Sequence, residues 1–190
     1  VIIATDGVAI IVHKDNKVKQ LTVAEIAAIF KGEITNWKEV GGDDMAITGY
    51  GRQSNSGTFE FVKEMVLLGK DFGASIRRMN GNSQIVKSVE TDKSGIGYVG
   101  VGYVVPAVAP LAVAASKGEA YVTPNGDDIF SGKYPLTRPL NQYVAGKPQG
   151  VLLDFLKFCV NSEEAAAIVK KHHFFAVQPK YKKINGASGL

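Results

Sequence analysis

The sequence predicts an α/β fold, because strand patterns and helix patterns alternate along the chain. Residues 8–12 form a continuous apolar run rich in β-branched side chains, which is typical of a strand buried on both faces. Such a strand belongs to a parallel or mixed sheet that helices cover. Residues 22–32 carry a helix with both ends marked in the sequence. The expected order is β-α-β-α-α-β, followed by β-α-α-β.

The elements of the first half rest on local signals. Thr22 and Glu25 form a capping box at a helix start, and Gly32 ends that helix. A second strand is expected at 45–50, and a helix at 57–68 follows a polar segment bounded by glycines. The apolar face of this helix is expected to contain Phe59, Val62, Met65 and Val66.

Ser83 is expected to cap a third helix, with Ile85, Val86 and Val89 on its apolar face. The stretch 94–116 carries no charge and is long enough to cross a bilayer. Glycines and prolines interrupt it, however, and strand-forming residues fill it. It therefore predicts two short buried strands with turns rather than a membrane helix.

The last third of the chain predicts a strand at 137–144, two helices and a final strand at 174–177. Ser162 is expected to cap the second of these helices. Cys159, in the first of these two helices, is the only cysteine and is expected to be a small buried hydrophobe rather than a nucleophile. The apolar face of that helix is expected to contain Val151, Leu152, Phe155, Leu156 and Cys159.

Composition narrows the possible functions. With 190 residues, 45% apolar and 21% charged, the chain suits one medium domain or two small lobes. The net charge of +4 is spread without a Lys/Arg block, so no nucleic-acid partner is expected. A single cysteine excludes an internal disulfide, and the three histidines lack metal-ligand spacing, so we expect neither a metal nor another cofactor. The start at Val1, without an initiator Met or a signal peptide, indicates a processed, truncated or renumbered chain.

The segment 50–60 is the candidate site for chemistry. It joins a predicted strand to a predicted helix start, where free backbone N–H groups attract an oxyanion. Arg52 offers a planar fork of N–H donors. Ser56 and Thr58 add hydroxyl donors, and Gly57 allows an anion to approach the backbone. The combination predicts an anion site; the alternative is that these residues only cap the helix.

Two nucleotide motifs are excluded. The segment after Arg52 lacks the Gly-Lys-Ser/Thr ending of a P-loop. The Gly-x-Gly-x-x-Gly pattern at 95–100 continues into apolar strand sequence instead of opening a helix, which argues against a dinucleotide site.

Several motifs, in family order over about the whole chain, resemble the phosphate-binding proteins of ABC phosphate transporters. The most distinctive is the Ile-Thr-Asn-Trp run at 34–37, which follows the helix at 22–32. The other matching segments are the strand at 5–12, the Arg-x-x-x-Ser-Gly-Thr loop at 52–58, the Gly-Ile-Gly-Tyr run at 95–98 and the late segment at 131–140.

This resemblance implies an α/β fold of the periplasmic-binding-protein type II, with two lobes whose mixed sheets are flanked by helices. Residues 7–98 would form a complete second lobe that carries the anion loop. Residues 1–6 and 99–190 would form the crossing strands and the C-terminal part of the first lobe. The N-terminal half-lobe of the family is expected to be absent from this sequence.

The resemblance also implies which residues bind inorganic phosphate: Arg52, Ser56, Gly57 and Thr58. Two further positions are secondary candidates. Ser54 stands where the family loop often carries an acid that orients the arginine, so it can form a hydrogen bond but adds no charge. Asp6 is a possible acceptor of the proton of hydrogen phosphate, although an Asp-Gly turn residue is the favoured interpretation.

The function expected from the resemblance is that of a non-enzymatic receptor, which traps phosphate between lobes by hinge closure and delivers it to a membrane ABC permease. Its location would be periplasmic or extracellular, with a membrane anchor before processing as one option. A complementing N-terminal chain is an expected partner.

Three alternatives stay open. The chain can be a signalling or interaction protein with altered or lost oxyanion binding, or one piece of a split binding protein. The least favoured alternative is a phosphoryl- or acyl-transfer enzyme, because a nucleophilic Ser56 would need a base and none neighbours it in sequence.

Overall fold

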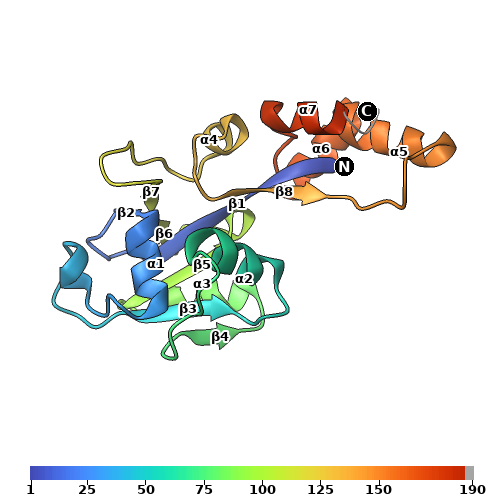
Figure 1. Ribbon diagram of the computed structural model, residues 1–190. Coiled ribbons are helices and arrows are strands. Elements are labelled where there is room, and N and C mark those ends of the chain that lie inside the picture. The colour runs from blue at the N-terminus through green and yellow to red at the C-terminus, as the bar shows by residue number, and fades with distance from the viewer. Residues whose placement is uncertain (187–190) are drawn as a thin grey trace. The chain divides into compact units, whose positions relative to one another are not determined.

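The computed structural model describes residues 1–186, which fall into two compact units (Figure 1). One unit contains Val1–Gly7 together with the chain from Asn125 onward, and the other contains Val8–Pro124. We call them the terminal unit and the central unit. The predicted α/β class is confirmed, because strands and helices alternate and form a mixed sheet flanked by helices. The proposed lobe boundaries at 6/7 and 98/99 stay predictions.

The central unit is built on one sheet with the strand order β4-β3-β5-β1-β6. Strand β1 runs antiparallel to β5 and β6, whereas β3 runs parallel to β4 and β5. The strand expected at 8–12 is longer than predicted and continues into the terminal unit. The strands are β1 (Ile2–His13), β3 (Thr48–Arg52), β4 (Arg77–Met79), β5 (Gly95–Gly100) and β6 (Val108–Pro110).

Helix α3 (Asn82–Thr91) covers one face of this sheet. Its Ile85, Val86 and Val89 are buried, as predicted, and pack with Tyr50 and residues of β1 and β5. Gly97 permits this close approach. A Cβ built at Gly97 would lie 2.5 Å from Cγ2 of Ile85. The Gly-x-Gly-x-x-Gly pattern therefore serves helix–strand packing inside β5.

Aromatic rings pack on the opposite face of the sheet. The ring of Tyr98 meets that of Phe30 edge-on at 5.3 Å between centroids and stacks with that of Phe72 at 5.9 Å. Phe59 stacks on Phe72 at 4.9 Å. Phe30 comes from α1 (Val23–Lys31) and Phe59 from α2 (Gly57–Phe61), so helices cover both faces.

Helix α1 has the ends that the sequence predicted. Thr22 Oγ1 accepts from the N–H of Glu25, and the Glu25 carboxylate accepts from the N–H of Thr22. Gly32 closes the helix in the left-handed region with φ at 80°. The short strand before it, β2 (Gln20–Thr22), was not predicted; it pairs in parallel with β7 (Ala112–Ala114).

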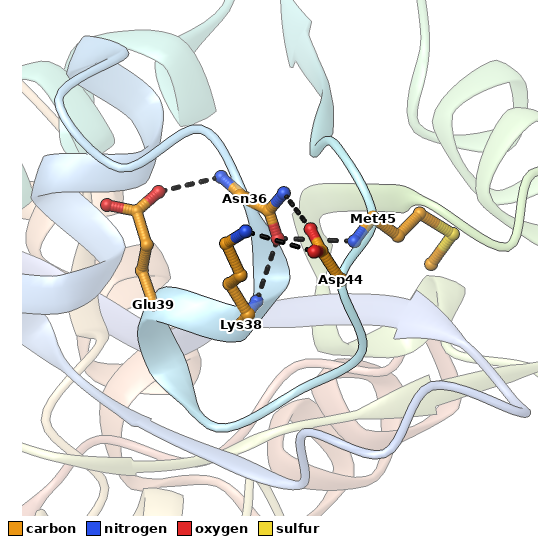
Figure 2. A network of polar contacts seen from close by, with 5 residues as sticks. All are labelled: Asn36, Lys38, Glu39, Asp44 and Met45. Atoms are coloured by element: carbon orange, nitrogen blue, oxygen red, sulfur yellow. Dashed lines mark hydrogen bonds and ion pairs between the residues drawn. The ribbon is translucent and has the colours of Figure 1, made fainter.

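The segment after α1 owes its shape to Asn36 (Figure 2). Its Oδ1 accepts from the N–H groups of Lys38 (3.0 Å) and Met45 (3.2 Å). Its Nδ2 donates to Asp44 (2.8 Å), and its own N–H donates to Glu39 (2.9 Å). Hydrogen bonds from Lys38 and then Asn36 lower the pKa of Asp44. The distinctive Ile-Thr-Asn-Trp run is therefore a capping device.

The strand and helix around 45–68 differ from the prediction. The strand expected at 45–50 lies at Thr48–Arg52 instead. Helix α2 passes into a π-helix, η2 (Val62–Val66), in which the N–H of Leu67 donates to the carbonyl of Val62. The wider turn takes Met65 off the apolar face, and 60% of its surface is exposed.

The cap predicted at Ser83 is wrong. Helix α3 already begins at Asn82, and Gly81 is its N-cap without a side-chain hydrogen bond. Ser83 therefore lies inside the first turn. The uncharged stretch 94–116 forms β5, a 3-10 turn η3 (Val101–Tyr103), β6 and β7, which makes three short strands rather than two. Among residues 1–186, no helix is long and apolar enough to cross a bilayer.

The terminal unit pairs the first half of β1 antiparallel with β8 (Thr137–Asn141). Asn185 joins the last described helix to β1. Its amide oxygen accepts from the N–H of Ile2 (2.9 Å), and its amide nitrogen donates to the Ile2 carbonyl (2.7 Å). The helices described in this unit are α4 (Gly126–Ser131), α5 (Gly150–Asn161), α6 (Glu163–Lys171) and α7 (Pro179–Gly186).

Several predictions for the terminal unit need correction. The strand expected at 137–144 ends at Asn141, and the strand expected at 174–177 is a single bridge between Thr5 and Phe175. The Ser162 cap is confirmed. The predicted apolar face of α5 exists but is mostly uncovered: Leu156 is buried, whereas Val151, Leu152 and Phe155 are exposed. Cys159 is half-buried, and burial raises the pKa of its thiol.

We expect Gly97→Ala to destabilise the central unit by about 1–3 kcal/mol, because the new methyl group would overpack the β5–α3 contact. The measurement is urea unfolding followed by the fluorescence of Trp37, which is buried and donates to the Ser94 carbonyl (2.9 Å). Gly186→Ala is the control, since its Cβ would meet nothing within 4 Å. Equal midpoints for Gly97→Ala and the wild type would contradict the packing role.

Candidate functional site

The candidate site lies where β3 passes into α2. Strand β3 ends at Arg52, and a turn closed by the Ser56 N–H and the Gln53 carbonyl (3.1 Å) leads into the helix at Gly57. Ser56 is the N-cap, and its Oγ accepts from the N–H of Thr58 (3.2 Å). Ser56 and Thr58 are buried, whereas Gly57 is exposed. The loop thus combines a capped helix start with an accessible glycine.

Three side chains hold Arg52, and one of them is Arg78, whose Nη1 donates to the Arg52 carbonyl (3.4 Å). The backbone N–H of Arg52 donates to the Tyr98 hydroxyl (2.9 Å), and its Nη1 donates to Oδ1 of Asn82 (3.1 Å). Its Nε is buried and has no hydrogen-bond partner. No ion pair within residues 1–186 includes Arg52. A buried, unpaired donor on a charged group costs free energy unless a ligand satisfies it.

Tyr98 fixes the backbone at the start of this loop. It is fully buried in the aromatic layer, and burial raises the pKa of its hydroxyl to about 12. The phenol is therefore neutral at physiological pH and remains a constant acceptor for the Arg52 N–H. A Cβ at Gly51 would lie 3.1 Å from the same hydroxyl oxygen, so the strand approaches the ring closely.

Two more arginines lie on β4, beside β3. Arg77 pairs in register with Tyr50, and its Nη1 donates to the Tyr50 hydroxyl (3.3 Å). Arg78 lies over the rings of Phe59 (5.0 Å) and Phe72 (4.4 Å). These contacts hold two further positive charges next to the strand that carries the candidate site.

A hollow of about 560 Å³ lies on the loop, lined by Gln53, Ser54, Asn55, Phe59 and Arg78. Ser54 faces this hollow, and the side chain that contacts Arg52 is Asn82 instead. Sequence reasoning did not identify Asn82, Tyr98 or Arg78. The only sequence signal for Tyr98 is its place in the Gly-Ile-Gly-Tyr run. Arg78 lies near the loop through the pairing of β4 with β3, and Asn82 through the position of helix α3.

Asp6 belongs to the terminal unit, and the turn expected for it is wrong. It lies within β1, is 3% exposed, and its Oδ2 accepts from both Nε (2.9 Å) and Nη2 (2.7 Å) of Arg138. In the part of the chain that is described, no three His, Cys, Asp or Glu side chains gather as a metal site.

The family model of the PBP superfamily domain matches residues 1–164. The chain belongs to this superfamily. The phosphate-binding protein PstS of Pseudomonas aeruginosa is 35% identical over 184 residues, and the match covers 88% of this chain and 57% of that protein. The PstS of Bacillus subtilis is 30% identical over 177 residues, with 92% and 56% covered. The chain therefore spans little more than half the length of these relatives.

Solved structures agree with this membership. An ABC-type phosphate transport receptor from Vibrio cholerae is 27% identical and superposes with a TM-score of 0.80, covering 93% of this chain and 72% of that one. A Clostridium perfringens protein, assigned as a phosphate ABC transporter substrate-binding protein and solved with bound phosphate, is 31% identical. Its TM-score is 0.78, with 94% and 71% covered. These relatives are binding proteins rather than enzymes, and the resemblance stated from the motifs is confirmed.

We expect Tyr98→Phe to destabilise the central unit by about 1–3 kcal/mol, because it leaves the N–H of Arg52 without its acceptor. Urea unfolding followed by Trp37 fluorescence measures the loss. Tyr103→Phe, at a half-exposed tyrosine, is the control and should leave the midpoint unchanged. A Tyr98→Phe variant as stable as the wild type would show that the hydroxyl is not needed to hold the loop.

Proposed function

We propose that this chain binds inorganic phosphate through Arg52, Ser56, Gly57 and Thr58 and belongs to a receptor that delivers phosphate to an ABC importer. The observation that carries the proposal is the buried Nε of Arg52, which has no partner at the loop where β3 meets α2. The names of the relatives, which are phosphate-binding proteins, support the choice of ligand.

The chemistry of the loop suits a tetrahedral oxyanion. Arg52 provides charge and N–H donors in a fixed plane. Ser56 accepts with its oxygen but keeps its own hydroxyl proton to donate. Gly57 is exposed, so an anion can reach the backbone without a side chain in the way. Three or four charge-assisted hydrogen bonds, each about 1.5–3 kcal/mol, support roughly micromolar binding after association costs.

Delivery to an importer assigns the receptor to the outer side of the cytoplasmic membrane, so the proposed location is periplasmic or extracellular. The membrane permease is then its protein partner. Binding and release, rather than bond making, is the function proposed for this site. Ser56 caps the helix by accepting from the Thr58 N–H, which is a structural role that needs no nucleophile.

The terminal unit suggests a further partner segment. Its sheet pairs β1 with β8, and a two-stranded pair is marginal by itself. Helix α5 exposes Val151 to 86% and Phe155 to 53%. The matched relatives contain much polypeptide outside the region that this chain spans. The proposed occupant of the α5 face is the corresponding polypeptide, whether in the same chain or as a complementing chain.

Calorimetric titration with phosphate tests the ligand. We expect saturable binding that Arg52→Ala weakens by roughly 10- to 150-fold, the loss of one charge-assisted contact. Arg77→Ala removes the same charge from a neighbouring strand without touching the loop, and it should bind nearly as the wild type. Competition with sulfate at equal concentration then measures which oxyanion the site prefers. A folded wild-type chain that takes up no phosphate would overturn the receptor proposal and favour a protein with altered ligand binding.

For the α5 face, we expect the 190-residue chain to bind a hydrophobic dye, and the double variant Val151→Lys, Phe155→Ser to bind less of it at unchanged stability. Leu156→Ala is the contrast. Because Leu156 is buried, this substitution should lower the free energy of unfolding by about 2–5 kcal/mol without lowering dye binding. If the double variant unfolds as readily as Leu156→Ala, the face is part of the core and needs no covering segment.

A further inference from the structure

Within the described residues, the guanidinium of Arg52 has one hydrogen-bond partner, the neutral amide of Asn82. Arginine has donors and no acceptor, so the Asn82 side chain must present its oxygen to Nη1, at 3.1 Å. Asn82 is the first residue of α3 and is half-buried. The rigid helix packed on β3 and β5 therefore sets the position of the amide oxygen.

The neutrality of this partner has an electrostatic consequence. A carboxylate in the same place would form an ion pair with Arg52 and cancel most of its charge. Ser54, two residues after Arg52 in the loop, adds no charge either. Asn82 thus restricts the guanidinium while leaving its whole positive charge available to a bound anion.

We propose that Asn82 is the positioning residue of Arg52 and that its neutrality determines how strongly the site attracts a multiply charged anion. This inference rests on the proposed function for its ligand and goes beyond it by naming a residue outside the loop. The oxygen of Asn82 holds Nη1, which directs the remaining edge of the guanidinium, including the unpartnered Nε, toward the anion.

Two substitutions separate position from charge. Asn82→Ala removes the acceptor and frees the guanidinium. Asn82→Asp keeps an acceptor oxygen but adds a negative charge, and an acid at a helix start does not weaken the helix. Asn80→Asp is the matched control, because it adds the same charge two residues away without a contact to Arg52.

The first measurement is the NMR signal of the Arg52 Nε–H group in the full chain without ligand, assigned by its loss in Arg52→Lys. In the wild type this buried group should give one slowly exchanging signal. Asn82→Ala should broaden it or move it toward the position of a free arginine, whereas Asn82→Asp and Asn80→Asp should keep it ordered. An unchanged signal in Asn82→Ala would overturn the positioning role.

The second measurement is phosphate titration of the same variants. Asn82→Ala should weaken binding about tenfold, the loss of one orienting hydrogen bond to a charged group. Asn82→Asp should weaken phosphate binding more than Asn80→Asp does, although Arg52 stays ordered in both. Equal affinities for these two variants would overturn the role of neutrality. If the wild type binds no phosphate while the NMR signal still responds to Asn82→Ala, the proposed function and the role of neutrality fail and the positioning role stands.

Discussion

The antiparallel pairing of β5 with β1 is the contact on which the candidate site depends. Its register sets Tyr98 opposite Ile10 and Gly97 opposite Ile11. Because neighbouring residues of a strand face opposite sides, Gly97 receives helix α3 while Tyr98 enters the aromatic layer. The Tyr98 hydroxyl then binds the backbone of Arg52 at the end of β3, and Asn82 at the start of α3 binds the Arg52 side chain. One pairing thus positions Arg52 from both faces of the sheet.

The three arginines of β3 and β4 share a property that their sequence positions do not reveal. Each is held by a neutral group: Arg52 by an amide, Arg77 by a phenol, and Arg78 by two phenyl rings. No ion pair in the described chain includes any of them. Their charge therefore remains available to attract anions over a distance of the order of the Debye length, about 8–10 Å at physiological salt.

The features that could be predicted from the sequence are those set by contacts between residues close together in the chain. The capping box of Thr22 and the left-handed Gly32 depend on residues within one turn, and both were predicted. Strands β2 and β4 have three residues each and form only by pairing with strands distant in the sequence, β7 and β3, so no periodicity marks them. The exposure of Phe155 depends on what lies against α5, which apolar spacing alone does not reveal.

The candidate site divides in the same way. The residues of the loop itself could be named from their chemistry, since arginine, serine, glycine and threonine follow one another within seven positions. Their binding role stays a prediction. Asn82 lies 30 residues from Arg52, and its contact requires that α3 start beside β3. The turn expected at Asp6 was wrong because an Asp-Gly pair is typical of turns. Its carboxylate is buried in a strand because the distant Arg138 pairs with it.

The π-helical stretch after the loop affects which changes in length this segment can tolerate during evolution. A π turn accommodates one residue more than the α-helical turn it replaces, as the bond from Leu67 to Val62 spans five positions. Loss of a single codon between 62 and 66 would remove that extra residue, restore regular α winding and leave the residues that follow in nearly their present orientation. The buried side chains of Val66 and Leu67 would keep their places in the core, and Leu68, which is 80% exposed, would stay outside it. This segment should therefore tolerate the loss of one residue better than a regular α-helix would.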